Sequence, residues 1–144
     1  MAERQDLVKT NKRLVTKIQY SGDTTAFVIG LTGSAFDPIG GTTGERFVAG
    51  ITNNTAAISR IIYNTSSLAN AIVGTWNASS GATSTAFIVT GSGTWDLERS
   101  TLNNNVANPT GTLTVAPLGA ISGTIIIEFV HRSGSVIPTN YYAT

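Results

Sequence analysis

Short runs of β-branched and aromatic residues recur along this chain at intervals of about 8–15 residues, and this repetition limits its fold more than any other feature. Clusters such as SGD, SSG and NNN separate most of the runs, and these residues favour turns. Nine runs predict strands: RLVTKIQY (13–20), TAFVIGL (25–31), RFVAGIT (46–52), ISRIIYN (58–64), AIVGTWN (71–77), TAFIVTG (85–91), TWDLER (94–99), TLTVAP (112–117) and TIIIEFV (124–130). The pattern predicts an all-β protein, an antiparallel β-sandwich or jelly-roll-like barrel of about 8–9 short strands with an extended N-terminal arm.

Two stretches leave a helix open. Residues 4–18 would align Leu7, Leu14 and Ile18 if they formed a helix, but they can equally be an extended arm that ends in the first strand. Residues 55–74 also have helical spacing. Their β-branched, Asn, Ser and Thr content instead favours two strands with a turn at NTSS (64–67).

The stretch GTIIIEFVHRSG (123–134) contains the only histidine of the chain. Alternation along a strand assigns its residues to two faces: Ile125, Ile127, Phe129 and His131 on one, and Ile126, Glu128, Val130 and Arg132 on the other. Glu128 and His131 then point apart, so they cannot form an acid/base pair within this strand. We interpret His131 as a partly buried structural residue, and no catalytic residue is predicted.

Composition favours a protein that packs against other proteins. A chain of 144 residues fits one domain, and the absence of cysteine excludes thiolate metal sites, thiol nucleophiles and disulfides. Only 12% of the residues are charged, about half of the ~25% that is usual, whereas 41% are hydrophobic. Burying such a neutral surface desolvates few charges. The strands TIIIEFV and AFIV (86–89) are apolar on both faces, which is expected where a neighbouring subunit covers a sheet.

Other motifs give no enzyme signal. Asp96 and Glu98 share one strand face about 7 Å apart, within the range of a hydrolase pair. Alternation turns Trp95 and Leu97 toward the core, and acids opposite such residues are ordinary on a half-buried strand. One histidine and eight scattered acids offer no metal-ligand spacing, so no metal and no cofactor are expected. Neither a signal peptide nor a membrane-spanning segment is predicted.

The termini are the predicted partner-binding segments, which divides the chain into a basic arm (1–12), a β-sandwich domain (13–136) and a tail (137–144). Five of the nine basic residues lie within the first seventeen positions, namely Arg4, Lys9, Lys12, Arg13 and Lys17. We expect them to contact acidic protein surfaces, because the segment has no aromatic interleaving before Tyr20 that would indicate nucleic acid. The tail VIPTNYYAT presents Tyr141 and Tyr142, and tyrosine is enriched at interfaces.

Low charge, no cysteine, many Thr, Asn and Gly residues, an N-terminal arm, short strands and the tail VIPTNYYAT resemble the small structural proteins of tailed-bacteriophage virions. In size the chain is most similar to capsid decoration (cement) proteins. The resemblance implies a non-enzymatic virion protein, made in the host cytoplasm, that binds the major capsid protein or other virion proteins and bridges subunits, often as a trimer. It carries over no catalytic residues.

Two alternative functions remain open. One is a neck or tail component of the virion, because such proteins share this composition. The other is a β-sandwich carbohydrate-binding module, in which Trp76, Trp95, Tyr141 and Tyr142 would act as stacking platforms.

Overall fold

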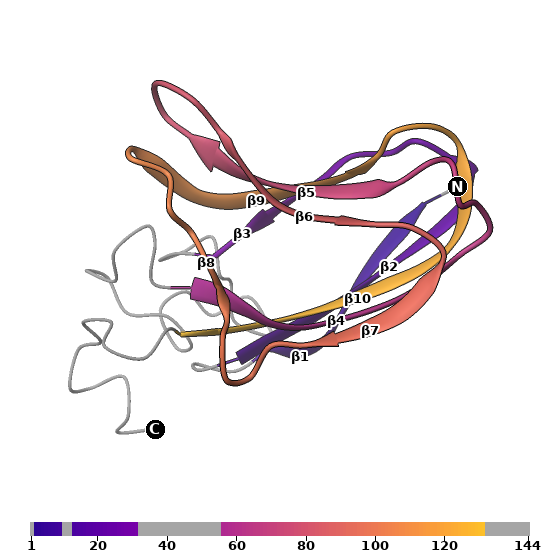
Figure 1. Ribbon diagram of the computed structural model, residues 1–144, viewed down its shortest axis with the longest axis horizontal. Helices are drawn as coiled ribbons and strands as arrows, with labels where there is room; N and C mark the ends of the chain where they lie inside the picture. Colours follow the sequence, from indigo (N-terminus) through magenta and orange to yellow (C-terminus); the bar gives the residue numbers. More distant parts are fainter. Residues whose placement is uncertain (1, 10–12, 32–55, 132–144) are drawn as a thin grey trace.

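The computed structural model describes residues 2–9, 13–31 and 56–131, which form two antiparallel sheets packed face to face (Figure 1). The larger sheet has the order β1 (Glu3–Lys9), β2 (Arg13–Asp23), β10 (Ile121–His131), β4 (Ala56–Thr65) and β7 (Ser92–Asp96), and its sixth strand β8 (Leu102–Asn103) also pairs with β4. The four-stranded sheet has the order β3 (Phe27–Gly30), β9 (Pro109–Pro117), β5 (Ile72–Ala78) and β6 (Ser84–Val89). The predicted all-β sandwich is confirmed, and it is an open sandwich without a closed barrel.

Most of the predicted strands are present in the structure. Eight of the nine overlap an observed strand, and the ninth, 46–52, lies outside the described residues. The stretch 55–74 contains β4, then a bend, then the start of β5, so the interpretation as strands with a turn is confirmed. The sequence pattern missed the two-residue β8 and the N-terminal β1.

The N-terminal segment differs from the arm expected for residues 1–12, because Glu3–Lys9 is the edge strand β1 of the larger sheet. It pairs with β2 from Glu3 opposite Gln19 to Lys9 opposite Leu14, with a register shift between Asp6 and Val8. An edge strand needs few apolar side chains, and charged residues and bulges protect such edges against unwanted pairing. A polar segment can therefore belong to the sheet. The other predicted boundary, at 136/137, lies outside the described residues.

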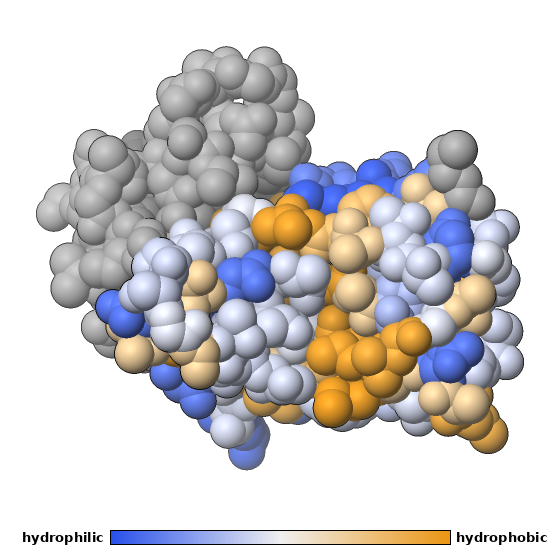
Figure 2. Space-filling view, turned by 90° about the horizontal axis from the view of Figure 1, so that it is seen from above, coloured by the Kyte–Doolittle hydropathy of each residue, from blue (hydrophilic) through white to orange (hydrophobic). Residues whose placement is uncertain are grey.

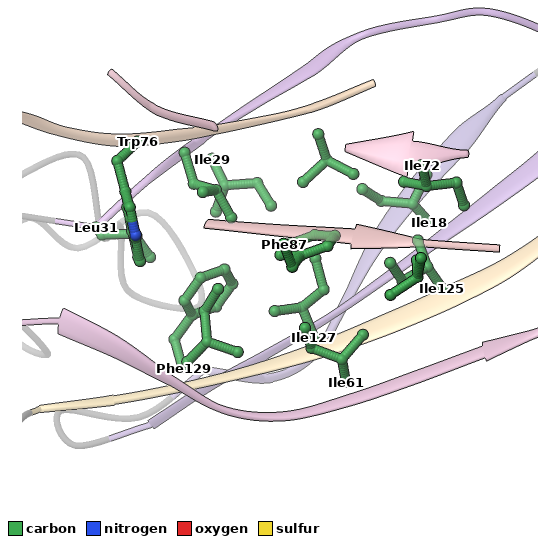
Figure 3. Packing of buried hydrophobic residues seen from close by; sticks show 14 of the residues in the cluster. Ile18, Ile29, Leu31, Ile61, Ile72, Trp76, Phe87, Ile125, Ile127 and Phe129 are labelled. Atoms are coloured by element: carbon green, nitrogen blue, oxygen red, sulfur yellow. The ribbon is translucent and has the colours of Figure 1, made fainter. Parts of the chain in front are cut away.

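The core fills the space between the sheets, as the side chains in Figure 3 show. The larger sheet contributes Ile18, Ile61, Ile125, Ile127 and Phe129, and the smaller one contributes Ile29, Ile72, Trp76 and Phe87. Leu31, which directly follows β3, is also buried in the core. The predicted alternation of the last strand is confirmed for its described side chains. Ile125, Ile127 and Phe129 are buried, whereas Ile126, Glu128 and Val130 are partly exposed on the outer face.

Two glycines permit close approaches that these sheets require. Gly74 on β5 lies opposite Phe87 on β6, and a Cβ at Gly74 would overlap the Phe87 ring. Gly123 on β10 has φ +141°, and a Cβ there would collide with the Asn64 carbonyl oxygen on β4. Both positions therefore favour glycine.

Ile127→Asp should prevent folding, because Ile127 is fully buried between the sheets and an unpaired buried charge costs several kcal/mol, comparable to the whole stability of a small domain. Ile126→Asp is the matched control: the same change one residue away, on the outer face. We expect soluble expression and a cooperative urea transition for Ile126→Asp only. A folded Ile127→Asp protein with an unchanged midpoint would contradict the assigned faces.

Candidate interaction face

The two sheets differ sharply in charge. No Asp, Glu, Lys, Arg or His occurs in β3, β5, β6 or β9, the four strands of the smaller sheet. Every charged side chain that the structure describes lies on β1, β2, β4, β7 or β10, or in the turn after β7. In the described part of the chain, the sandwich therefore has one charged outer face and one neutral outer face.

Alternation and the cross-strand register define the neutral face. The residues of the smaller sheet that point outward are together called the neutral face: Val28, Val73, Thr75, Asn77, Thr85, Ile88, Thr110, Thr112, Thr114 and Ala116. Val73 lies between Ala116 and Ile88, which makes an apolar row across three strands. Val28 is 59% exposed and Ile88 is 55% exposed. Figure 2, seen from the side of this sheet, shows apolar surface in the middle of a pale, weakly polar face.

Hydroxyl and amide groups form the rest of this face. Asn77 Nδ2 donates to Thr112 Oγ1 at 3.0 Å and to Thr114 Oγ1 at 2.8 Å. Thr110 and Thr112 share a hydrogen bond of 2.8 Å between their hydroxyl oxygens. These groups are already bonded to one another, so a partner can cover them without leaving the Asn77 amide protons unsatisfied.

Two leucines extend the apolar surface at the end of the sandwich where the apolar row lies. Leu68, in the β4–β5 loop, is 82% exposed, and Leu118, in the β9–β10 loop, is 72% exposed. Hydrogen bonds hold these loops together: the Leu118 amide donates to the Ala71 carbonyl at 2.9 Å, and Asn70 Nδ2 donates to the Ala120 carbonyl at 3.2 Å. These hydrogen bonds hold the two loops, and with them Leu68 and Leu118, in fixed positions relative to each other.

Of the predicted arm cations, the structure describes the side chains of Arg4, Arg13 and Lys17, and two of these three are held in ion pairs within the chain. Arg4 Nε donates to Asp6 Oδ1 at 3.2 Å, and Thr16 Oγ1 donates to the same oxygen at 2.9 Å. Arg13 Nε lies 3.2 Å from Glu128 Oε1, across β2 and β10. These arginines are neutralised within the chain. The side chain of Lys9 and the whole of Lys12 lie outside the described residues.

Among the arm cations whose side chains the structure describes, Lys17 is the one without an ion pair. It lies on the outer face of β2 between Gln5 of β1 and Ile126 of β10. Together with Glu3, Arg4, Gln5 and Gln19 it lines a shallow polar depression on this sheet. The depression and the neutral face belong to different sheets, so they can contact different partners.

Both tryptophans proposed as stacking platforms contact the core. Trp76 is 2% exposed and packs in the core (Figure 3), and Trp95 is partly buried against the same core. A ring as buried as that of Trp76 cannot stack on a sugar, so the structure contradicts that role for Trp76. Tyr141 and Tyr142 lie outside the described residues.

The carboxylates of Asp96 and Glu98 have structural partners. Asp96 Oδ1 accepts a hydrogen bond from the Glu98 amide at 3.3 Å, and Glu98 Oε1 lies 3.2 Å from Arg60 Nη2. Trp95 and Leu97 turn toward the core as predicted. Among the described residues, no three His, Cys, Asp or Glu side chains gather as metal ligands, and no helix is long and apolar enough to cross a membrane.

Tyr20 is a buried phenol at the end of β2. Burial, and then the negative charge of Asp23, raise the pKa of Tyr20. Its ring meets Phe27 edge to face, with centroids 6.3 Å apart. The phenol stays protonated at neutral pH and serves the packing of the core.

The neutral face was not predicted as a site, although the sequence contains a signal for it. Residues 24–36, 61–95 and 100–127 contain no Asp, Glu, Lys, Arg or His, and these runs include all four strands of the smaller sheet. Local patterns cannot show that these strands share one sheet, because their pairing is long-range.

Deleting residues 1–12 should lower the melting temperature by more than about 5 °C, because it removes a paired strand and uncovers the buried Thr16 and Ile18 on β2. Calorimetry of the truncated and full chains tests this. The control is the double substitution Glu3→Gln/Gln5→Glu, which keeps β1 and should leave the melting temperature within about 2 °C. An unchanged melting temperature after the deletion would mean that β1 is not part of the stable sheet.

Searches against protein-family models, curated protein sequences and solved structures find no match to this chain.

Proposed function

We propose that this protein is a non-enzymatic structural subunit of a virion, specifically a decoration (cement) protein on a bacteriophage capsid. The observation that carries the proposal is the uncharged outer face of the smaller sheet. An exposed apolar patch within an uncharged face, such as the row of Ala116, Val73 and Ile88, marks a surface that another protein covers. A subunit that is held permanently in a particle has such a neighbouring protein to cover the surface.

The charged sheet supports a second contact of the same subunit. Its outer face offers Lys17 and the polar depression beside β1. Contacts of this kind guide a subunit to an acidic protein surface and weaken with salt. We assign attachment to the capsid shell to this sheet and to the terminal segments, and contact between decoration subunits to the neutral face.

Purified particles from the source organism give the decisive test. Mass spectrometry should detect the chain in a fixed ratio to the major capsid protein, and electron microscopy should place it in a regular array on the capsid shell. A position at the neck or tail would reject the decoration role and retain the structural one. Absence from the particles, or catalytic turnover by the purified protein, would reject the proposed function.

Lys17→Gln should weaken attachment to particles stripped of this protein by about three- to fivefold, as for the loss of one exposed charge pair. Co-sedimentation at low and high salt measures this, and high salt should weaken attachment of the parent protein. Arg60→Gln, on β4 of the same sheet, is the matched control, because Arg60 is already paired with Glu98. Equal binding by parent and Lys17→Gln at both salt concentrations would remove Lys17 from the contact.

A further inference from the structure

We infer that the neutral face is the contact surface between two copies of this chain, which pack it back to back about a two-fold axis. The inference rests on the proposed function in one respect: both require that another protein molecule covers this face. It goes further by naming the occupant and the symmetry.

Charge is the first argument for a second copy. In a two-fold interface each residue meets the same surface of an identical subunit, so charged groups near the axis face like charges. The neutral face carries no ionisable side chain, so two copies meet without like-charge repulsion. The outer face of the larger sheet carries Arg13, Lys17, Arg60 and Glu128 and lacks this property.

Packing is the second argument. Sheets stack about 10 Å apart with strand directions rotated by about 30°, and the chain's own two sheets already pack face to face. The row formed by Ala116, Val73 and Ile88 offers side chains that can interdigitate with the same row of a second copy. The result is a stack of four sheets in which both outermost faces are the charged ones.

Hydrogen bonding permits this burial. The Asn77 amide and the Thr110, Thr112 and Thr114 hydroxyls are already joined to one another. Thr75 and Thr85, directly opposite each other on β5 and β6, can pair across the axis. Covering the face therefore leaves few polar groups without a hydrogen-bond partner. Unsatisfied polar groups are the usual obstacle to burying a polar sheet surface.

The size of the face sets the strength of the dimer. Four strands about 4.8 Å apart and about 6 residues long at 3.3 Å per residue cover on the order of 400 Å² in plan. A standard interface buries about 800 Å² on each partner, so we expect a dimer that forms in the micromolar range and is favoured where copies are crowded on a particle. Two identical faces that pack against each other are related by a two-fold axis. The inferred dimer therefore differs from the trimer that the resemblance implies.

Sedimentation of the full chain over a concentration series tests the inference. The parent should approach twice the chain mass of 15.0 kDa at high concentration. Val28→Lys/Ile88→Lys should remain monomeric, with dimerisation at least ~100-fold weaker, because both copies then place charges in an apolar contact. Both side chains are more than half exposed in one subunit, so the fold should survive. Val28→Ser/Ile88→Ser removes the apolar contact without adding charge and should weaken the dimer less.

Ile62→Lys is the matched control, because Ile62 is an exposed isoleucine (39%) on the larger sheet. It should dimerise like the parent, and high salt should not dissociate the dimer. A parent that is monomeric at every concentration, a trimer, or equal dissociation by Ile62→Lys would overturn the inference.

Particle binding separates this inference from the proposed function. Loss of the dimer with Val28→Lys/Ile88→Lys while Lys17-dependent attachment persists supports the inference. A dimer in a protein absent from particles would reject the proposed function alone.

Discussion

The packing of β10 against the smaller sheet is the interaction on which the rest of the structure depends. β10 pairs with β2 on one side and β4 on the other, so it occupies the middle of the larger sheet. Its inward residues Ile125, Ile127 and Phe129 are fully buried and face the core side chains of the smaller sheet, including Phe87 (Figure 3). Apolar burial of this kind is the main favourable term in folding. It also fixes which side of every neighbouring strand faces outward.

That division of faces makes the two outer surfaces of the sandwich chemically different. With the inner residues buried in the core, the outer face of the larger sheet presents ion pairs such as Arg13 with Glu128. It also presents Lys17, which has no ion pair among the described residues. The smaller sheet presents threonine, asparagine and aliphatic side chains only. One face suits water and salt-sensitive contacts, and the other suits contact with protein. The proposed role as a particle subunit uses both kinds of surface.

Sequence patterns predicted the strands and the faces of β10, because alternation is local and needs no knowledge of the neighbours. They missed β1, because a polar edge strand and a solvated arm have similar compositions. They also offered Trp76 as a sugar platform, because burial of its ring depends on a facing sheet that the sequence does not place. The neutral face depends on β3, β5, β6 and β9 meeting in one sheet, and residues distant in sequence decide that pairing.

Amide hydrogen exchange on the particle-bound protein, compared with the dilute free protein, tests the central claim most directly, because it maps the covered surface strand by strand. The account predicts slower exchange in β3, β6 and the loops that carry Leu68 and Leu118, which border the neutral face. Slower exchange confined to the larger sheet, with these segments unchanged, would show that the neutral face stays open to solvent and would contradict the account.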